Sequence, residues 1–373
     1  MPLFKQHVVV EIARGVKAFL NLEAGVTRGA APGPPQADQS RELEQAHQEL
    51  ANKERELTEL RARLVRSGTG TGDGGVRPEN MVWIFGDGRS GSTWLMNMVS
   101  ELEGQTLWRE PMVGLLFGYL YYVWADEKRY KTKHFIMGRY RESWLRSIRN
   151  FVLDGARTVH PELPENEYLV IKEPNGSIGA PLLMEALPES RMILLVRDPR
   201  DVVASSMDAH RQGGWHYERR NLQRSLADED PDDFVKNRAN KYLWSVGNSK
   251  QAYEAHEGPK VLVRYEELRA DTVGTMKRIY STLGIPIDEG ELVQTVEKHS
   301  WENVPEEEKG EGKFYRKASP GGWREDLTPE QVETVERITA PLLEEFYSYE
   351  GQSEGPSERL PLDWFSRHRV FYA

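Results

Sequence analysis

Apolar positions define a strand, a glycine-rich loop and a helix between residues 81 and 102. Met81 to Phe85 form an unbroken apolar run that a glycine ends, which is typical of a parallel strand covered on both faces. Beyond the loop, apolar residues return at helical spacing: Leu95, Met98, Val99 and Leu102. Loop glycines let backbone N–H groups converge, and the helix N-terminus adds partial positive charge. The pattern therefore predicts a phosphate-binding strand-loop-helix unit.

The same alternation of apolar runs and helical patterns continues along the chain. Further strands are predicted at 168–171, 192–196 and 261–263. Helices are predicted at 180–187, at 201–209, around Tyr242 and Val246, and at 271–283, where Gly284 is the stop signal. Thr328, Pro329 and Gln331 form a capping box that starts another helix. The expected fold class is α/β, with a central, mostly parallel sheet and helices on both faces.

Composition divides the chain into six segments. They are a short amphipathic helix (1–29), a Pro-rich linker (30–40), a heptad segment (41–66), a Gly-rich linker (67–76), the α/β body (77–350) and a C-terminal tail (351–373). In the heptad segment leucine recurs every seven residues, at Leu43, Leu50, Leu57 and Leu64. This repeat predicts either a coiled coil that forms a homodimer or a lone helix, and the sequence leaves both open.

Composition also limits the functions to consider. The 373-residue chain has no cysteine and its nine histidines form no metal-binding motif, so neither disulfides nor a metal site is expected. A net charge of −10 disfavours general nucleic-acid binding. No uncharged run is long enough to span a membrane, so the chain is expected to be cytoplasmic. The stretch 128–149, with eight Lys/Arg against one acid, is either a solvated helix face or a wall facing an anionic ligand.

The loop after the first strand differs at one position from that of ATP- and GTP-hydrolysing enzymes. Gly86, Gly91 and Thr93 fit the pattern GxxxxGK[ST], but Ser92 stands where the lysine should be. That lysine neutralises the β- and γ-phosphates, so its absence argues against a nucleotide kinase or triphosphatase. Arg89 offers a cation from another position. A kinase remains an alternative, as does a non-catalytic scaffold that works through the heptad segment.

A second motif follows the strand at 192–196. Arg197 stands at the carboxyl end of that strand, where open α/β sheets bind ligands, and Ser205 lies eight residues further on in the next helix. The two side chains are candidates for a second phosphate clamp. Alone, Arg197 with Asp198 and Asp201 would be only a salt bridge at the start of a helix.

Together the two loops resemble those of the sulfotransferases that use 3′-phosphoadenosine 5′-phosphosulfate (PAPS). The family's P-loop-like element, [KR]-S-G-[ST]-T, binds the 5′-phosphosulfate and is matched throughout by Arg89, Ser90, Gly91, Ser92 and Thr93. The interval from Arg197 to Ser205 is that of the family's arginine and serine on the 3′-phosphate. The resemblance spans about residues 82–324. It implies a PAPS-dependent sulfotransferase that releases adenosine 3′,5′-bisphosphate (PAP) and needs no metal.

Other positions extend the resemblance. The residues that stand where the family contacts adenine are Trp94, Tyr265 and Trp301. Arg316 and Lys317 begin a segment similar to the family's RKGxxGDWK loop over the 3′-phosphate. This segment departs from the family pattern at Ala318, where glycine is usual, and at Gly322, where aspartate is usual.

The resemblance also implies the groups for sulfuryl transfer. Lys172, at the end of a predicted strand, matches the family lysine beside the sulfuryl group, and with Arg89 it would stabilise the charge that develops in an in-line displacement. Cytosolic members use a histidine two residues further on as the base, but Pro174 stands there. Glu110, which resembles the glutamate of the carbohydrate and tyrosylprotein branches, is favoured as the base over Glu173. The expected acceptor is a hydroxyl, with a carbohydrate or small-molecule alcohol favoured and an anionic acceptor left open.

Overall fold

The computed structural model describes residues 75–124, 140–211, 213–215 and 230–347, together with 45, 47–53, 55 and 56. The predicted segments 1–29, 30–40 and 351–373 lie outside the described residues, as do residues 67–74 of the second linker. The described residues between 45 and 56 are helical and belong to a compact unit distinct from the body. Of the four heptad leucines only Leu50 is described, and it is 49% exposed. The coiled coil and the homodimer therefore stay predictions.

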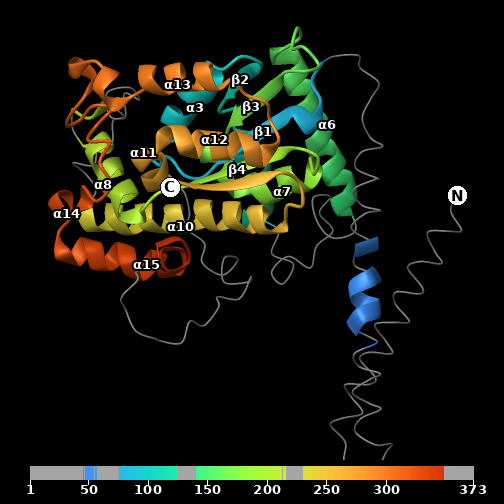
Figure 1. The fold of residues 1–373 in the computed structure, drawn as a ribbon. Coiled ribbons are helices and arrows are strands. Elements are labelled where there is room, and N and C mark those ends of the chain that lie inside the picture. The colour runs from blue at the N-terminus through green and yellow to red at the C-terminus, as the bar shows by residue number, and fades with distance from the viewer. Residues whose placement is uncertain are drawn as a thin grey trace, which may run out of the picture. The chain divides into compact units, whose positions relative to one another are not determined.

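Five strands form a parallel sheet in the order β2-β3-β1-β4-β5 (Figure 1). They are β1 (Met81–Phe85), β2 (Gln105–Arg109), β3 (Tyr168–Lys172), β4 (Arg191–Val196) and β5 (Lys260–Arg264). β1 lies at the centre and is buried along its whole length, as its apolar run predicts. The α/β class and the four predicted strands are confirmed. β2 is not predicted from the sequence, because an edge strand that is only partly buried needs no long apolar run.

Helices connect the strands. The α-helices of the described body are α3 (Ser92–Ser100), α4 (Val113–Trp124), α6 (Arg141–Val159), α7 (Ala180–Ala186), α8 (Pro199–His210), α10 (Pro231–Ala255), α11 (Tyr265–Ala270), α12 (Thr272–Leu283), α13 (Glu289–Lys298), α14 (Trp323–Asp326) and α15 (Pro329–Tyr347). Short 3₁₀ turns are η1 (Pro78–Asn80), η3 (Pro174–Gly179), η5 (Trp301–Asn303) and η6 (Glu306–Glu308). Each helix predicted for the body is present. The sequence patterns do not predict α4, α11, α13 or α14, and of α6 they indicate only a candidate basic helix face within 128–149.

The two faces of the sheet carry separate apolar cores, because side chains alternate along each strand. Met81, Trp83 and Phe85 of β1 belong to the core formed with α6, α7 and α10. Val82 and Ile84 belong to the opposite core, with α3, α12 and α13. Figure 1 shows the sheet between these layers, with α10 and α15 along one side and α3 and α13 along the other. The apolar positions predicted for α3 are buried in this second core.

Two helix ends confirm the signals in the sequence. Gly284 ends α12 in the left-handed region, at φ 65°, where glycine meets no steric penalty. Thr328 and Gln331 form the capping box at the start of α15. The Thr328 N–H donates to Gln331 Oε1 (3.1 Å), and the Gln331 N–H donates to Thr328 Oγ1 (3.3 Å).

The basic stretch 128–149 is described only from residue 140 onward. There it forms the start of α6, where Arg149 is buried and donates to Glu189 Oε2 (2.8 Å), and Arg141 pairs with Glu185 (2.5 Å). These arginines fasten α6 to α7 and to the loop that follows it. The described part of the stretch is therefore structural, and it does not line the cavity presented below.

Glycines let α4 pack closely on η3. A Cβ at Gly118 would lie 2.5 Å from the Cα of Gly179, and a Cβ at Gly114 would lie 2.0 Å from the carbonyl oxygen of Gly176. Both distances are shorter than non-bonded atoms allow, so only glycine fits. The contact holds the start of α4 against the end of β3, where the Glu110 N–H also donates to the Lys172 carbonyl (2.9 Å).

Replacing Gly118 by alanine is expected to lower the free energy of unfolding by about 1–3 kcal/mol, because the added methyl group overpacks the contact with η3. Urea denaturation of both proteins measures the change. The matched control is Gly290→Ala in α13, where a Cβ meets only the Asp288 side chain (3.2 Å) and alanine favours the helix by up to about 1 kcal/mol. Equal stability of the Gly118→Ala variant and the native protein would contradict the close contact.

Candidate active site

The carboxyl ends of β1, β3 and β4 open into a cavity of about 740 Å³. The predicted site residues that line it are Arg89, Gly91, Ser92, Thr93, Trp94, Glu110, Lys172, Arg197, Ser205, Tyr265, Trp301, Arg316 and Lys317. Two predicted residues do not line it, Ser90 and Glu173, and both are fully buried. Loops that are far apart in the chain therefore meet at one edge of the sheet, where the fold class predicts a ligand.

The loop 86–91 turns tightly from β1 into α3. Gly91 has φ 90° and precedes the first turn of α3, and a Cβ there would lie 2.5 Å from the Tyr265 ring, so glycine is required. Ser90 is turned inward, where its hydroxyl donates to the Asp87 carbonyl (2.7 Å). Since Gly91 brings no side chain to cap α3, the amides of the first turn, which lines the cavity, can bind an anion.

Arg238 of α10 fixes this loop from behind. Its guanidinium donates to Asp87 Oδ2 (2.6 Å), to the Gly88 carbonyl (2.9 Å) and to Ser206 Oγ (2.8 Å). Asp87 is fully buried and Arg238 is 8% exposed, so this ion pair is shielded from water. The sequence does not reveal the pair, because two residues so far apart share no motif.

Arg89 joins the two predicted phosphate motifs. Its Nε donates to Ser205 Oγ (3.1 Å) and its Nη2 to the Phe314 carbonyl (2.9 Å), and the guanidinium carbon lies 5.3 Å from the centre of the Trp215 ring and 5.0 Å from that of Phe314. These contacts place the Arg89 guanidinium beside Ser205 of the second motif, in the cavity that Lys172 also lines. Burial, and then the charges of Arg197 and Arg238, lower the pKa of Arg89 to about 10, so it remains charged at neutral pH.

Arg197 lies beside Arg89 at the end of β4. Its Nη1 donates to the Arg89 carbonyl (3.1 Å), and its guanidinium lies 4.3 Å from the centre of the Tyr265 ring. Asp201, one helical turn on, is 3.8 Å away. The Arg197 Nε is buried and has no hydrogen-bond partner among the described residues. Arg197 also lines the cavity, and a guanidinium with an unpaired donor suits an anionic ligand.

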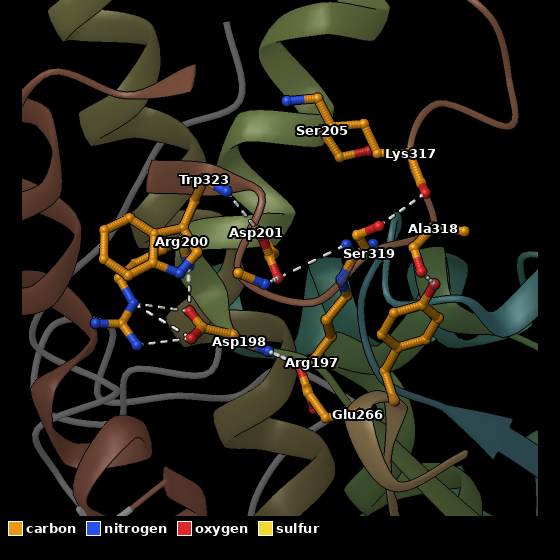
Figure 2. A network of polar contacts seen from close by, with 12 residues as sticks. Arg197, Asp198, Arg200, Asp201, Ser205, Glu266, Lys317, Ala318, Ser319 and Trp323 are labelled. Carbon is orange, nitrogen blue, oxygen red and sulfur yellow. Dashed lines mark hydrogen bonds and ion pairs between the residues drawn. The ribbon is translucent and has the colours of Figure 1, made fainter. Parts of the chain in front are cut away.

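Asp201 ties α8 to the segment that begins at Arg316 and Lys317 (Figure 2). Its carboxylate is 3% exposed and accepts the N–H groups of Gly321 (2.8 Å) and Trp323 (3.0 Å). Because the same carboxylate also pairs with Arg197, which directly follows β4, it connects the second motif to this later segment. Sequence reasoning assigns Asp201 only to a helix-start salt bridge and misses this connection.

The later segment has a left-handed residue at Ala318, where the family motif has glycine. Ala318 has φ 50°, a conformation that costs a residue with a Cβ about 1–2 kcal/mol. The Ala318 carbonyl accepts hydrogen bonds from the Tyr265 hydroxyl (3.3 Å) and from Arg269 Nε (3.1 Å). These two bonds and the carboxylate of Asp201 hold the segment from both sides.

Aromatic side chains contribute to the cavity wall. The Trp94 and Tyr265 rings meet edge to face with their centroids 6.2 Å apart, and Trp94 Nε1 donates to the His299 carbonyl (2.8 Å). Trp301 is half-buried in the same cavity, with Lys309 Nζ 5.2 Å from its ring centre. Such rings offer apolar faces to a flat aromatic ligand.

Lys172 and Glu110 form an ion pair in the cavity. Lys172 Nζ donates to Glu110 Oε1, and Asn175 Nδ2 donates to Glu110 Oε2 (3.0 Å). The lysine side chain is 7% exposed and the glutamate side chain 31%. The structure thus brings together the two residues that the resemblance implied. Asn175 adds a contact that sequence reasoning misses, because the irregular η3 turn carries no pattern.

Glu173 points away from the cavity. Its carboxylate accepts the N–H of Met112 (3.0 Å) at Oε2 and the N–H of Gly114 (3.1 Å) at Oε1. Burial raises the pKa of Glu173 to about 7, and the nearby charge of Glu110 contributes in the same direction. The two backbone bonds and Lys172 oppose this shift. Glu173 is therefore bonded to the backbone at the start of α4 and not to Lys172.

The cavity is suited to a ligand with several negative charges. Its basic lining residues are Arg89, Arg109, Lys172, Arg197, Arg238, Lys241, Arg269, Arg316 and Lys317, against the carboxylates of Glu110 and Asp201. In the described part of the chain no three His, Asp or Glu side chains gather as a metal site would require. Among the described helices, none is long and apolar enough to cross a membrane.

The fold and the site define an α/β protein with a basic cavity at the carboxyl edge of its sheet. The chain belongs to the sulfotransferase family, because residues 79–347 match the family's sulfotransferase domain. This match confirms the family and the enzyme class predicted from the two loops. It does not fit a nucleotide kinase.

Several relatives are similar to this chain. Cytosolic sulfotransferase 12 of Arabidopsis thaliana is 27% identical over a 300-residue alignment that covers 65% of this chain and 86% of the relative. A mouse sulfotransferase complexed with PAP is 16% identical, with a TM-score of 0.47 and coverage of 72% of this chain and 86% of its own. A Mycobacterium avium sulfotransferase is 15% identical, with a TM-score of 0.48, and the match covers 74% of this chain and 78% of that protein. The family assignment rests on the domain match alone.

The raised pKa of Glu173 predicts a pH dependence of stability. The folded carboxyl keeps its proton to about pH 7, whereas the ordinary value is 4.5, so the folded state binds the extra proton between these values. The free energy of unfolding should therefore fall as the pH rises through this window, by up to about 3 kcal/mol.

Urea denaturation between pH 5 and pH 7.5 measures this effect as a difference between the native protein and Glu173→Gln. The native protein should lose more stability than the variant as the pH rises. Parallel pH dependences in the two proteins would show that Glu173 titrates near its ordinary value.

Proposed function

We propose that this protein transfers the sulfuryl group of PAPS to the hydroxyl of an acceptor. The observation that carries the proposal is the hydrogen bond from Arg89 Nε to Ser205 Oγ. It joins the P-loop-like element to the second clamp within a cavity that also contains Lys172 and Glu110. Membership of the sulfotransferase family supports this reaction class.

The donor would lie along the edge of the sheet. The amides at the start of α3, with the Ser92 and Thr93 hydroxyls, are suited to the 5′-phosphosulfate. Arg197, with its unpaired buried Nε, Ser205 and Arg316 are suited to the 3′-phosphate. The residues proposed to contact adenine are Trp94, Tyr265 and Trp301. Lys317 would add a second positive charge beside the 3′-phosphate.

The reaction would be an in-line displacement at sulfur. The bond between sulfur and the bridging oxygen of the 5′-phosphate breaks, and a bond from sulfur to the acceptor oxygen forms, with PAP as the leaving group. Negative charge grows on the bridging oxygen, where Lys172 and the loop amides can stabilise it. Glu110 would accept the hydroxyl proton, because its carboxylate lies in the cavity beside Lys172 while the carboxylate of Glu173 is occupied by backbone N–H groups.

For the acceptor we propose only a chemical class. A carbohydrate or small-molecule alcohol is favoured, because Glu110 resembles the glutamate of the carbohydrate branch. The name of the plant relative, a cytosolic sulfotransferase, is consistent with a cytoplasmic location for this chain. A homodimer through residues 41–66 remains part of the proposal on the leucine repeat alone.

Glu110→Gln is expected to lower kcat by roughly 10²- to 10⁴-fold, because the amide cannot take the acceptor proton. Binding of PAP should stay within about twofold of the native protein, since Glu110 contacts no proposed donor-binding residue other than Lys172. Turnover with labelled PAPS and calorimetry with PAP provide the two measurements. Glu162→Gln, at an exposed position outside the cavity, is the matched control. Near-native turnover of Glu110→Gln would remove Glu110 from the role of base.

Arg197→Ala is expected to weaken PAP binding by roughly 10- to 100-fold, the worth of a charge-assisted hydrogen bond of about 1.5–3 kcal/mol. Adenosine 5′-phosphosulfate, which lacks the 3′-phosphate, should bind with nearly unchanged affinity. Calorimetry with both nucleotides tests the assignment, with Arg337→Ala on the exposed face of α15 as the control. Equal losses for the two nucleotides would contradict a 3′-phosphate contact.

A further inference from the structure

The backbone that carries Glu110 has an unusual conformation. Glu110 has φ 45° and Met112 has φ 60°, and a proline stands between them. Neither residue is glycine, so each left-handed conformation costs about 1–2 kcal/mol. Such a conformation persists only where the surroundings hold it, and it is typical of functional sites. Contacts with neighbouring groups must therefore hold residues 110–112 in this shape.

Glu173 supplies the principal side-chain contact to this segment. Its two carboxylate oxygens accept the N–H groups of Met112 (3.0 Å) and Gly114 (3.1 Å). The carboxylate therefore lies at the first turn of α4, where helix amides lack internal partners and the helix dipole favours negative charge. Its own N–H donates to the Ile84 carbonyl of β1 (2.9 Å). Glu173 thus links the central strand to the turn before α4.

The η3 turn has no room for a side chain at Gly176 while the Glu173 carboxylate is in place. A Cβ at Gly176 would lie 1.9 Å from Glu173 Oε1. Lys172 and Glu173 are adjacent at the end of β3 and point in opposite directions, as strand geometry requires. Lys172 Nζ donates to the Glu110 carboxylate in the cavity. Outside the cavity, the Glu173 carboxylate accepts the N–H of Met112, two residues after Glu110.

We propose that Glu173 is a positioning residue that sets the turn 110–112, so that the Glu110 carboxylate is presented to Lys172 and to the acceptor hydroxyl. The inference rests on the proposed function, in which Glu110 is the base. It assigns different roles to two neighbouring carboxylates. Glu110 exchanges a proton with the acceptor, and Glu173 acts only through the backbone.

The first test is Glu173→Gln. A glutamine presents one acceptor oxygen and one NH₂ group, so it can satisfy only one of the two backbone N–H groups. We expect kcat to fall by roughly 10- to 100-fold, the size of effect that a displacement of about 1 Å has on a reacting group. PAP binding should change by less than about twofold. Gly176→Ala should likewise lower kcat and leave PAP binding nearly unchanged, because the added methyl group displaces the Glu173 carboxylate and does not replace it.

The decisive test adds Met112→Gly to Glu173→Gln and compares the double variant with Met112→Gly alone. Glycine adopts φ 60° without strain, and Met112 is 37% exposed, so the exchange removes the strain at residue 112 and leaves only that of Glu110. If Glu173 acts by holding this turn, Glu173→Gln should lower kcat at least about fivefold less when residue 112 is glycine than when it is methionine. The same comparison with Gly176→Ala applies should Glu173→Gln fail to fold.

Two results would overturn the proposal. One is native kcat in both Glu173→Gln and Gly176→Ala. The other is an undiminished kcat loss in the glycine background, which would mean that Glu173 takes part in the chemistry directly. Different experiments would reveal a failure of the proposed function. Glu110→Gln would then keep near-native turnover, or the native protein would not bind PAP.

Discussion

The structure depends on holding several arginines close together at the carboxyl edge of the sheet. Like charges repel, and burial removes the water that would screen them. Burial, and then the charges of Arg197 and Arg238, lower the pKa of Arg89 to about 10. Buried carboxylates offset the repulsion: Asp87 pairs with Arg238, and Asp201 pairs with Arg197. Each of these carboxylates also connects separate segments, so the charges and the loops are fixed together.

A second constraint is backbone strain next to the same cavity. The described non-glycine residues with positive φ are Arg89, Glu110, Met112 and Ala318. Three of them line the cavity, and Met112 is two residues from Glu110. Strain of this kind is retained where the surrounding contacts over-determine it. Here the contacts come from the ends of β3 and β4 and from α8 and α11, which are rigid parts of the fold.

Much of this arrangement could be predicted from the sequence. The apolar run of β1, the glycines after it and the interval from Arg197 to Ser205 are local patterns, and they identify both the sheet and the two phosphate motifs. The predicted strand at 168–171 also places Lys172 at a strand end, and the structure brings it to Glu110. The family match then confirmed the enzyme class.

The remaining features depend on tertiary contacts that no local pattern encodes. β2 is a partly buried edge strand, and Arg238 reaches Asp87 from a distant helix. The strand predicts that Glu173 points away from Lys172, but the backbone N–H groups that it binds could not be predicted, because they depend on where α4 begins relative to β3. That position follows from the glycine contacts between α4 and η3, which are too irregular to read as a motif.

The most direct test of the central claim is a calorimetric titration with PAP, compared with ATP in the presence of Mg²⁺. A cavity that holds two separated phosphate groups by arginines and amides should bind PAP without a metal, with a dissociation constant on the order of micromolar. ATP with Mg²⁺ should bind at least about tenfold more weakly, because Ser92 replaces the lysine that a triphosphate needs. Tighter binding of ATP with Mg²⁺, or no binding of PAP, would contradict the account.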